Sequence, residues 1–354
     1  PSEECSTANI CTNFTKGSVL CYDTVLEFGQ KVDMIALEME NVNIDALLKL
    51  KEQGKQVFPD PDILKIIQDK GLQKQFYADN NIPTANFKLY PDKTAILSAI
   101  EKNELTLPFV QKTSTAGYDG KGVKLVRNEE DVQSLLDGAS VVEDLTAIKK
   151  ELSVIVTQST NNEIKTFPTV EMVFNDSANL VEELICPADV SEDIKNEADR
   201  LAIDLIKKLD LKGILAVEMF LTHDDEIIIN EVAPRPHNSG HHTIEGTITS
   251  QYEQYLRSIF GFPLGDTSII LPSVMINLLG EDGYDGKVKY EGVTESLALK
   301  GVKVHIYGKK ETRSFRKMGH VTVLDEDINK ALEKANRAKD ILKIKGSKKI
   351  WVNH

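Results

Sequence analysis

The stretch "ILAVEMFLTHDDEIIINEVAPRPHNSGHHTIEG" spans residues 214–246. Two apolar runs stand on either side of "HDD", so residues 214–232 are expected to form a β-hairpin. Directly after the second run, the chain carries a carboxylate, an arginine and three histidines. A surface loop can carry such a set, but side chains of this kind at the end of a buried strand are also typical of a reaction centre.

The register of this hairpin bears on a pair of glutamates. A two-residue turn at Asp224 and Asp225 places Glu218 opposite Glu231 on one face of the hairpin. Like charges in direct opposition destabilise a sheet, whereas a divalent cation such as magnesium favours paired carboxylates. A longer turn is the alternative, and it would shift the register and turn one glutamate to solvent. The apolar residues expected on the same face are Ala216, Phe220, Ile227 and Ile229.

A glycine-rich segment, "FVQKTSTAGYDGKGV", covers residues 109–123 and lies between two expected strands. The backbone amides of such a loop can bind phosphates, although glycines between strands more often form a plain turn. The segment is not a Walker A sequence, because no G-K-[ST] opens a helix. Lys112 ends the first strand, where it either reaches a nucleotide phosphate or is simply solvated.

The residues after the hairpin leave two interpretations open. His237 and His241 are four residues apart, which is zinc-site spacing on a helix, but no glutamate follows as in H-E-x-x-H. A zinc hydrolase is therefore the less favoured alternative. Arg235 lies beside the expected cation site, where it could stabilise charge during phosphoryl transfer, or else pair with a surface carboxylate. The residues that argue against a helix here are Pro234, Pro236 and Gly240.

The overall composition indicates an ordinary globular chain. Of its 354 residues, 41% are hydrophobic and 27% are charged, which fits two or three domains. The net charge of -13 argues against a general nucleic-acid or membrane-surface binder. We find neither a bilayer-spanning apolar run nor a signal-peptide pattern. The cysteines lack C-x-x-C spacing, which favours reduced thiols in the cytoplasm; they are Cys5, Cys11, Cys21 and Cys186.

The periodicity of the rest of the chain predicts mixed α and β structure. A strand at 32–40, a helix at 44–54 and a strand at 56–60 suggest a parallel α/β domain at the start. Residues 80–90 are expected to be a connector. Further helices are expected at 93–102, 191–213, 249–261 and 327–342, and further strands at 108–113, 122–127, 140–145 and 150–159.

Several segments together closely resemble one family, the N5-carboxyaminoimidazole ribonucleotide synthetases, which are ATP-grasp ligases of purine biosynthesis. The resemblance covers nearly the whole chain and is most specific in the histidine segment. The segments are "QDKGLQKQFYADNNIPTANF", "TAGYDGKGV", "INEVAPRPHNSGHHTIEGTITSQYEQYLRSIFGFPLG", "PSVMINLLG" and "YGKKETRSFRKMGHVTV".

The resemblance implies an α/β (α+β) ATP-grasp fold. Residues 1–80 would form a Rossmann-like preATP-grasp domain, residues 81–265 the ATP-grasp domain with a lid at about 81–145, and residues 266–354 a small β-rich C-terminal domain. The family's opening strand and its G-x-G-Q-L-G loop are missing before Pro1. The first domain is therefore expected to lack its first strand.

The resemblance also implies an activity. The family uses ATP, Mg²⁺ and bicarbonate to carboxylate 5-aminoimidazole ribonucleotide through carboxyphosphate, which suggests a cytoplasmic enzyme and a homodimer without nucleic-acid or membrane partners. Two alternatives remain: an ATP-grasp ligase that acts on a different amine, and a nucleotide-binding module without catalysis. A basic pair that could bind a ribose phosphate favours 5-aminoimidazole ribonucleotide over a different amine. Nucleotide binding without ATP hydrolysis would favour the module.

The residues of the nucleotide site follow from the family's motifs. The resemblance places Lys70 and Lys112 at the ATP phosphates, Glu151 at the ribose, and Glu218 and Glu231 at Mg²⁺. The segment expected at the adenine is Glu143, Asp144, Leu145 and Thr146. The loop expected over the phosphates is Gly117, Tyr118, Asp119, Gly120, Lys121, Gly122 and Val123.

The remaining site residues concern bicarbonate and the aminoimidazole. The resemblance places Arg235 and His237 where bicarbonate is phosphorylated, with His237 as a candidate to remove a proton. Tyr118 and Asp119 would also face the aminoimidazole ring. The residues expected at the ribose phosphate are Lys309 and Arg316.

The sequence departs from the family's pattern at two of these positions. The wider ATP-grasp superfamily often has E-x-N-x-R at the metal strand, and this chain has alanine where the asparagine would stand. Asn230 is the candidate replacement. His242 stands where the family often has an aromatic residue.

Overall fold

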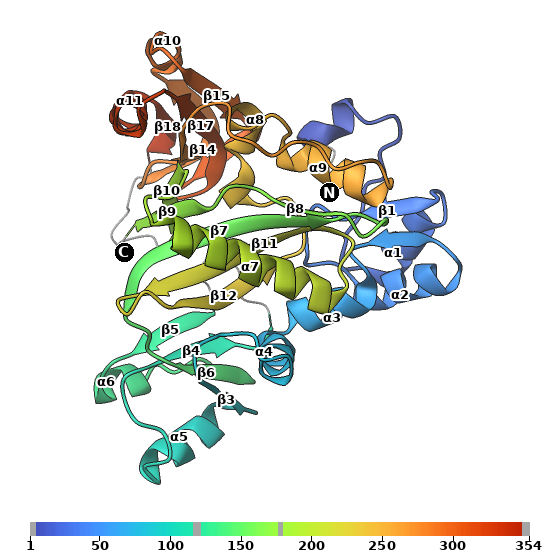
Figure 1. The fold of residues 1–354 in the computed structure, drawn as a ribbon, viewed down its shortest axis with the longest axis vertical. Helices are drawn as coiled ribbons and strands as arrows, with labels where there is room; N and C mark the ends of the chain where they lie inside the picture. Colours follow the sequence, from blue (N-terminus) through green and yellow to red (C-terminus); the bar gives the residue numbers. More distant parts are fainter. Residues whose placement is uncertain (1–4, 116–121, 176–179, 349–354) are drawn as a thin grey trace.

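The computed structural model describes residues 5–115, 122–175 and 180–348 (Figure 1). The N-terminal part contains a two-stranded parallel sheet covered by helices, with a core that includes Leu47, Leu50 and Leu64. The strand expected at 32–40 forms over only three residues. The elements are η1 (Ser6–Asn9), α1 (Tyr22–Gly29), β1 (Met34–Ala36), α2 (Ile44–Glu52), β2 (Gln56–Phe58) and α3 (Pro61–Gln68).

Helix α4 (Lys70–Asp79) leads into a four-stranded antiparallel sheet, which we call the lid sheet. Its strand order is β3-β6-β4-β5. The expected connector at 80–90 contains one of these strands, because Phe87–Tyr90 pairs with residues 140–143. The elements are β3 (Phe87–Tyr90), α5 (Lys93–Glu101), β4 (Phe109–Thr113), β5 (Val123–Val126), α6 (Glu129–Val132) and β6 (Ser140–Asp144).

The centre of the molecule is a nine-stranded antiparallel sheet with the order β12-β11-β7-β9-β10-β13-β17-β15, in which β8 pairs with β7. The sheet therefore joins the middle of the chain to its C-terminal third. Its strands are β7 (Ile148–Gln158), β8 (Ile164–Thr166), β9 (Val170–Asn175), β10 (Leu180–Cys186), β11 (Gly213–Thr222), β12 (Ile227–Ala233), β13 (Ser273–Leu279), β15 (Val302–Ile306) and β17 (Lys317–Leu324).

Two helices bury opposite faces of this sheet at β7 and β11. Helix α7 (Glu192–Leu209) packs on the face that carries Val154 and Val217, and helix α9 (Gln251–Ile259) packs on the face that carries Ile155 and Ala216. Both helices begin at a serine, Ser191 and Ser250, whose side chain caps the backbone. Adjacent residues of one strand thus lie in two different cores.

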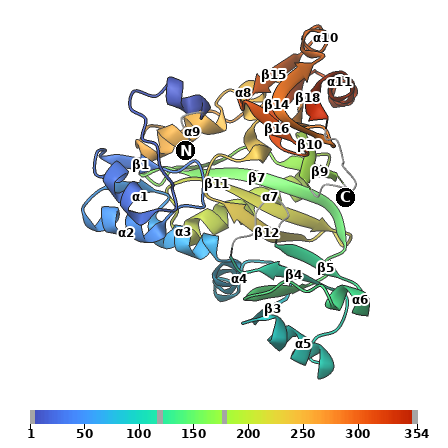
Figure 2. The ribbon, with the colours of Figure 1, turned by 180° about the vertical axis from the view of Figure 1, so that it is seen from behind.

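The C-terminal third adds a three-stranded sheet with the order β16-β14-β18 and a helix that packs on β13 and β17. In both Figure 1 and Figure 2, these elements and the lid sheet lie at opposite ends of the molecule. No helix in the described ranges is long and apolar enough to cross a membrane. The elements are β14 (Tyr284–Glu291), α10 (Val293–Leu297), β16 (Glu311–Arg313), α11 (Ile328–Ile341) and β18 (Lys343–Lys348).

The central hairpin pairs Glu218 with Glu231 as expected, but its turn and its register differ from the prediction. The turn is one residue longer than predicted, because the backbone N–H of Thr222 donates to the carbonyl of Glu226 and Asp225 adopts a left-handed conformation with φ of 60°. An extra residue on β12, Asn230, then shifts the register back by one. The two deviations cancel at the glutamates.

The predicted face was wrong for the residues between the turn and this bulge. Ile229 lies opposite Met219 rather than Phe220, and it packs in the core beneath α7. Ile227 belongs to the same core, on the side of the sheet opposite Ala216. Successive residues of a strand point to opposite faces, so a register shift of one residue moves side chains to the other face of the sheet. The bulge therefore places these isoleucines on the face opposite the two glutamates.

Candidate active site

A buried group of charges lies where the lid sheet meets the central sheet. The Glu143 carboxylate is 2.8 Å from Nζ of Lys74 and 2.9 Å from Nζ of Lys112, and all three side chains are buried. Lys70 forms an ion pair with Glu231. We call these five residues the lysine cluster. It joins α4, two lid strands and β12 through charged contacts.

The charges in this cluster compensate one another. Burial alone would raise the pKa of Glu143, but Lys112 and Lys74 outweigh burial and hold that pKa below its usual value. Burial lowers the pKa of Lys74 to about 8, although Glu143 acts in the opposite direction. Burial also lowers the pKa of Lys70, but Glu231 outweighs it and the net pKa is raised. The ion pairs therefore keep Glu143 and Lys70 charged.

One side-chain and one backbone hydrogen bond hold the two expected phosphate-binding lysines in place. Lys112 donates from Nζ to Oδ1 of Asn230, the bulge residue, at 2.7 Å. The backbone N–H of Lys70 donates to the carbonyl of Ser114 at 2.8 Å, so α4 begins beside the glycine-rich segment. Thr84 accepts from Lys74 and donates to the carbonyl of Ile229, one residue before the bulge. The bulge thus brings an amide oxygen to Lys112.

The carboxylates of Glu218 and Glu231 form an arrangement that fits a divalent cation. Burial, together with the charges of Glu231 and Glu151, raises the pKa of Glu218 to about 8. For Glu231, Lys70 outweighs burial and lowers the pKa. A buried carboxyl whose ionisation is opposed by a neighbouring carboxylate is stabilised in its charged form by a cation. Lys70 supplies one positive charge here, and the donor set suits Mg²⁺.

The expected ribose and adenine residues lie around the same region. Burial raises the pKa of Glu151, on β7, to about 7. In the expected adenine segment, the side chain of Glu143 is buried beneath the lysines, whereas Asp144 and Leu145 are exposed at the end of β6. Asp144 accepts a hydrogen bond from Asn86 at 3.0 Å. The end of β6, rather than the Glu143 side chain, is therefore open to a ligand.

The glycine-rich loop lies mostly outside the described residues. That part includes five residues expected to bind ligand: Gly117, Tyr118, Asp119, Gly120 and Lys121. Of the rest, Gly122 adopts a left-handed conformation with φ of 80°, and its carbonyl accepts from the backbone N–H of Thr113 at 2.8 Å. Val123 follows with an exposed side chain. The described residues on either side of this part, Thr113 and Gly122, are thus hydrogen-bonded to each other next to Lys112.

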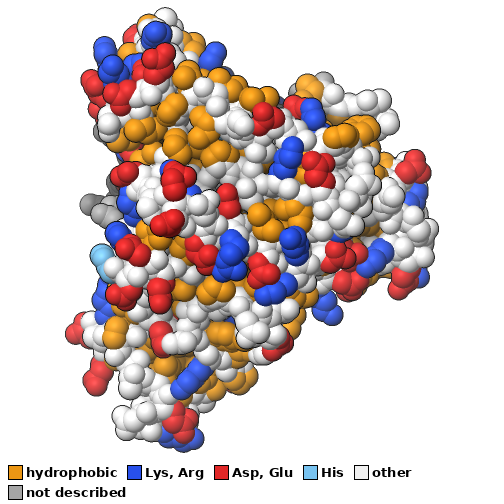
Figure 3. Space-filling view, viewed as in Figure 1, with side chains coloured by type: hydrophobic (Ala, Val, Ile, Leu, Met, Phe, Trp, Pro, Cys, Tyr) orange, Lys and Arg blue, Asp and Glu red, His pale blue; other side chains and the backbone are white. Residues whose placement is uncertain are grey.

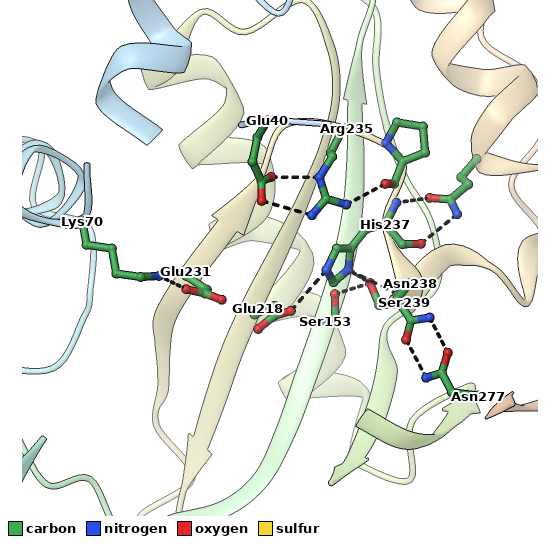
Figure 4. Close-up of polar contacts among 12 residues, drawn as sticks. Glu40, Lys70, Ser153, Glu218, Glu231, Arg235, His237, Asn238, Ser239 and Asn277 are labelled. Carbon is green, nitrogen blue, oxygen red and sulfur yellow. Dashed lines mark hydrogen bonds and ion pairs between the residues drawn. The ribbon is translucent and has the colours of Figure 1, made fainter. Parts of the chain in front are cut away.

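Arg235 follows β12 and is held by a residue of the first domain (Figure 4). Its guanidinium donates to both carboxylate oxygens of Glu40, from Nε at 2.9 Å and from the terminal nitrogen at 3.1 Å. It also donates to the carbonyl of Pro236 at 3.1 Å. This two-point contact fixes the plane of the guanidinium. Arg235 thus pairs with a carboxylate, that of Glu40, which was one of the two interpretations of the sequence, and it does so next to His237.

His237 is bound on both its ring and its backbone. Its Nε2 lies 3.4 Å from Oε1 of Glu218, and its Nδ1 lies 2.9 Å from Oγ of Ser239. Gln251 accepts from the backbone N–H of His237 and donates to its carbonyl, both at 2.8 Å. Burial, with help from Arg235 and Lys317, lowers the pKa of His237 to about 3, so its ring is neutral.

Beyond His237 the chain forms two short helical turns, η2 (Asn238–Gly240) and α8 (Thr243–Gly246), where prolines and glycine had argued against a helix. His241 stacks on His320 with ring centroids 4.8 Å apart, and His320 stacks on His305 at 4.4 Å. We call these three residues the histidine cluster. It joins the segment after β12 to β15 and β17.

The two residues expected at a ribose phosphate lie in adjoining loops of the C-terminal third. Lys309, between β15 and β16, donates from Nζ to the carbonyl of Lys317 at 2.6 Å. Arg316, between β16 and β17, donates to the carbonyl of Glu311 at 2.6 Å. Lys317, the first residue of β17 and directly after Arg316, contributes to the low pKa of His237.

Some residues of the site were missed in the sequence. Lys74 lies one helical turn after Lys70, a spacing that could have indicated a shared face. Glu40 is 195 positions from Arg235, and no local pattern signals that contact. The other missed residues are Ser153, Ser239 and Gln251.

For the zinc alternative, no group of three or more His, Cys, Asp or Glu side chains in the described ranges is arranged to hold a metal ion.

Comparison with family models covers most of the chain. Residues 75–252 match the ATP-grasp domain, residues 1–68 match the ribonucleotide synthetase preATP-grasp domain, and residues 273–334 match the phosphoribosylaminoimidazole carboxylase C-terminal domain. The first of these models alone spans half of the chain. The three matches include Lys112, Glu143, the paired glutamates and the histidine segment, whereas Lys70 and Lys74 lie in the gap between residues 68 and 75.

Individual relatives agree with these models. N5-carboxyaminoimidazole ribonucleotide synthase of Bacillus subtilis is 39% identical over 308 residues, which are 86% of this chain and 78% of the relative. Longer relatives named phosphoribosylaminoimidazole carboxylase match over 55% to 60% of their length, so the function of their remaining parts is not carried over.

Solved structures give the same result. The Thermotoga maritima N5-carboxyaminoimidazole ribonucleotide synthetase has a TM-score of 0.85 and 40% identity, over 94% of this chain and 87% of that one. The Aspergillus clavatus synthase, solved with ADP and 5-aminoimidazole ribonucleotide, has a TM-score of 0.85 and 29% identity, over 94% of this chain and 88% of that one. This chain belongs to the N5-carboxyaminoimidazole ribonucleotide synthase family of ATP-grasp ligases.

Proposed function

We propose that the chain uses ATP and bicarbonate to carboxylate 5-aminoimidazole ribonucleotide, producing N5-carboxyaminoimidazole ribonucleotide, ADP and phosphate in purine biosynthesis. The observation that carries this proposal is the arrangement along β12. Glu218 and Glu231 stand paired beside the lysine cluster, and Arg235 and His237 follow at the end of the same strand. A site for nucleotide phosphates and a site for a small anion thus adjoin.

At the nucleotide end, Lys112 and Lys70 contact the ATP phosphates, and Glu143 keeps Lys112 directed toward the bulge. Glu151 accepts hydrogen bonds from the ribose, and the exposed edge of Asp144, Leu145 and Thr146 lies along the adenine. Glu218 and Glu231 would hold Mg²⁺, with Asn230 beside them. Bound there, Mg²⁺ would neutralise charge on the transferring phosphoryl group.

At the other end, Arg235 binds bicarbonate and His237 lies next to it. A bicarbonate oxygen attacks the terminal phosphorus of ATP, the bond from that phosphorus to the bridging oxygen breaks, and ADP leaves. The amine of the aminoimidazole then attacks the carboxyl carbon of carboxyphosphate, and phosphate leaves. Carboxyphosphate decomposes in water, so the lid sheet and its loop have to exclude water during both steps.

Three groups of residues hold the aminoimidazole ribonucleotide in this proposal. Lys309 and Arg316 bind its ribose phosphate, and Lys317 adds positive charge on the same side. The ring lies against Tyr118 and Asp119 of the glycine-rich loop. Lys309→Ala should therefore raise the KM for the ribonucleotide roughly tenfold, because a lysine–phosphate contact contributes about 1.5 kcal/mol or more, while the KM for ATP stays the same.

The most direct test measures ADP release with bicarbonate, with and without 5-aminoimidazole ribonucleotide. The proposal predicts release that depends on both substrates, together with formation of the N5-carboxylated product. Release that depends on another amine instead would favour a different ATP-grasp ligase. Nucleotide binding without release under either condition would favour a module without catalysis.

For assembly, we propose a homodimer. Helix α9 exposes Tyr252 and Leu256, Phe260 is exposed directly after its last residue, and Ile244 and Ile248 are exposed in the segment before it. Several large apolar side chains exposed within one short segment are typical of a protein interface. Figure 3 shows further apolar side chains gathered over the C-terminal elements beside α8. Light scattering after size exclusion should give twice the chain mass, and Leu256→Glu should give a monomer.

For location, we propose the cytoplasm. All four cysteines are free thiols, and Cys186 is buried. Free thiols of this kind are typical of a reducing compartment.

A further inference from the structure

The ring of His237 caps the turn that follows it. Helix η2 begins directly after His237, and Nδ1 accepts the backbone N–H of Ser239 at 3.3 Å. The side-chain Oγ of Ser239 lies 2.9 Å from the same nitrogen. A backbone N–H can only donate, so Nδ1 has to present its lone pair and carries no hydrogen.

The hydrogen of the neutral ring then lies on the other nitrogen. An imidazole ring whose Nδ1 carries no hydrogen is the neutral form, because both nitrogens carry hydrogen in the charged ring. A neutral imidazole has one N–H, and the contact made by one nitrogen decides where that hydrogen lies. It therefore lies on Nε2, which is 3.4 Å from Oε1 of Glu218. His237 directs an N–H toward this carboxylate.

A second serine supports the arrangement from β7. Oγ of Ser153 lies 2.9 Å from Oγ of Ser239, and both side chains are buried. If the hydroxyl of Ser153 donates to Ser239, the hydroxyl of Ser239 is free to donate to Nδ1. The hydrogen-bond donors of Ser153, Ser239 and the His237 ring then all point in one direction, from β7 toward Glu218. Figure 4 shows the two serines on one side of the ring and Glu218 on the other.

We propose that Ser239 is a positioning residue that holds His237 as its Nε2–H tautomer, so that His237 serves as a hydrogen-bond donor to Glu218 and to an oxygen anion bound beside it. This role differs from proton removal, which was expected from the sequence, because a ring nitrogen that carries hydrogen has no lone pair for a proton. The catalytic consequence of this inference rests on the proposed function, whereas the contacts of His237 with Ser239 and Glu218 do not depend on that function.

Nitrogen NMR of the full-length protein with ¹⁵N-labelled histidine tests the tautomer directly. The signals of His237 are assigned by their loss in His237→Gln. At neutral pH, without substrates and again with ADP, we expect the Nε2–H pattern. An Nδ1–H tautomer or a protonated ring would overturn the proposal. The spectrum needs no turnover, so it can succeed or fail independently of the proposed reaction.

Ser239→Ala tests the positioning role. In this variant Nδ1 keeps only the 3.3 Å contact with the backbone N–H and loses the 2.9 Å contact with Oγ, so we expect the preference for the Nε2–H tautomer to weaken measurably. We also expect a roughly fivefold fall in kcat, as the loss of one hydrogen bond implies, with an unchanged KM for ATP. Ser258→Ala is the matched control, since Ser258 is a fully buried serine whose hydroxyl donates to a carbonyl within α9. If Ser239→Ala keeps both the wild-type tautomer and the wild-type kcat, Ser239 has no such role.

Discussion

The lysine cluster and the histidine cluster are both buried polar groups, but they meet the cost of burial in different ways. In the lysine cluster, Glu143 and Glu231 keep their charges because lysines stand within ion-pair distance. In the histidine cluster, burial lowers the pKa of His241 to about 3 and that of His320 to about 2, so the rings are neutral. One cluster is held by charge pairs, the other by stacking and single hydrogen bonds.

This difference matches the chemistry proposed for each side of β12. Nucleotide phosphates and a divalent cation require fixed charges of both signs, and these stand ready at the lysine cluster. The histidine cluster joins two parts of the chain, and its two rings with lowered pKa values, His241 and His320, add no charge near the site of bicarbonate. The contrast suggests that charge changes should matter most near Glu218 and that pH changes should matter most near His320.

The largest effect is expected at the paired glutamates. Glu218→Gln removes one of two proposed cation ligands, so the rate of ADP release should fall at least ~100-fold, since loss of even an outer partner of a metal ligand costs 10–100-fold in affinity or activity. Isothermal titration should show a matching loss of Mg²⁺ dependence in nucleotide binding. Glu226→Gln, on the exposed end of the same hairpin, is the control and should behave as wild type. Near-normal turnover in Glu218→Gln would refute the cation site.

Neutralising Glu143 should destabilise the protein. Glu143→Gln leaves Lys74 and Lys112 buried without their shared counter-charge, and breaking a buried ion pair costs about 3 to 5 kcal/mol. The free energy of unfolding, measured in urea, should fall by that amount, and the KM for ATP should rise. Glu52→Gln breaks an exposed pair with Lys49 and should change stability by less than about 1 kcal/mol. Equal effects of the two variants would contradict the role given to the lysine cluster.

Acid should destabilise the histidine cluster. The folded-state pKa of His320 lies below its unfolded value of about 6.5, so its contribution to stability is present above pH 6.5 and is lost as the pH falls. Protonation would also place a second N–H at Nε2, which has no hydrogen-bond partner among the described residues. Between pH 7 and pH 5 this histidine should account for a loss of about 2 kcal/mol.

His320→Gln isolates this contribution. The variant should lose about 2 kcal/mol less than wild type over the same pH interval, as measured by urea unfolding at both pH values. The carboxyls with raised pKa values act in the opposite direction, since folded Glu218 and Glu151 bind protons more tightly than the unfolded chain does, and their contribution falls as the pH rises toward about 8 and about 7. Identical pH dependence in wild type and variant would show that His320 is not the acid-sensitive residue.

The smallest effect on stability is expected at Glu40. The pair between Glu40 and Arg235 is only partly buried, so Glu40→Gln should change the free energy of unfolding by less than about 1 kcal/mol. It should still raise the KM for bicarbonate, because the guanidinium loses its two-point contact with a charged partner. An unchanged KM for bicarbonate would mean that Glu40 does not orient Arg235 for substrate.

Local patterns in the sequence were sufficient for the long helices and for the pairing of the two glutamates. The helix at 191–213 shows a clear apolar stripe and a serine cap, and it is present as α7. The hairpin register was correct at Glu218 for an incomplete reason, since neither the longer turn nor the bulge at Asn230 has a sequence signal as clear as Asn-Gly. Contacts with other parts of the structure determine both the length of the turn and the position of the bulge.

The partners of the site residues could not be predicted in the same way. Lys74 was read as part of a family segment, but its burial against Glu143 depends on how α4 packs against the lid sheet. Glu40 meets Arg235 only because the first domain closes over the end of β12. Single-sequence patterns report local periodicity, whereas these contacts connect elements that are far apart in the chain.

Crystals grown with ADP and Mn²⁺ test the central claim most directly, because manganese can be located by its anomalous scattering. The account predicts one manganese ion that is bound by carboxylate oxygens of both Glu218 and Glu231 and by the nucleotide phosphates, with Lys70 released from Glu231. Manganese bound at another position, or both carboxylates turned away from the phosphates, would contradict it.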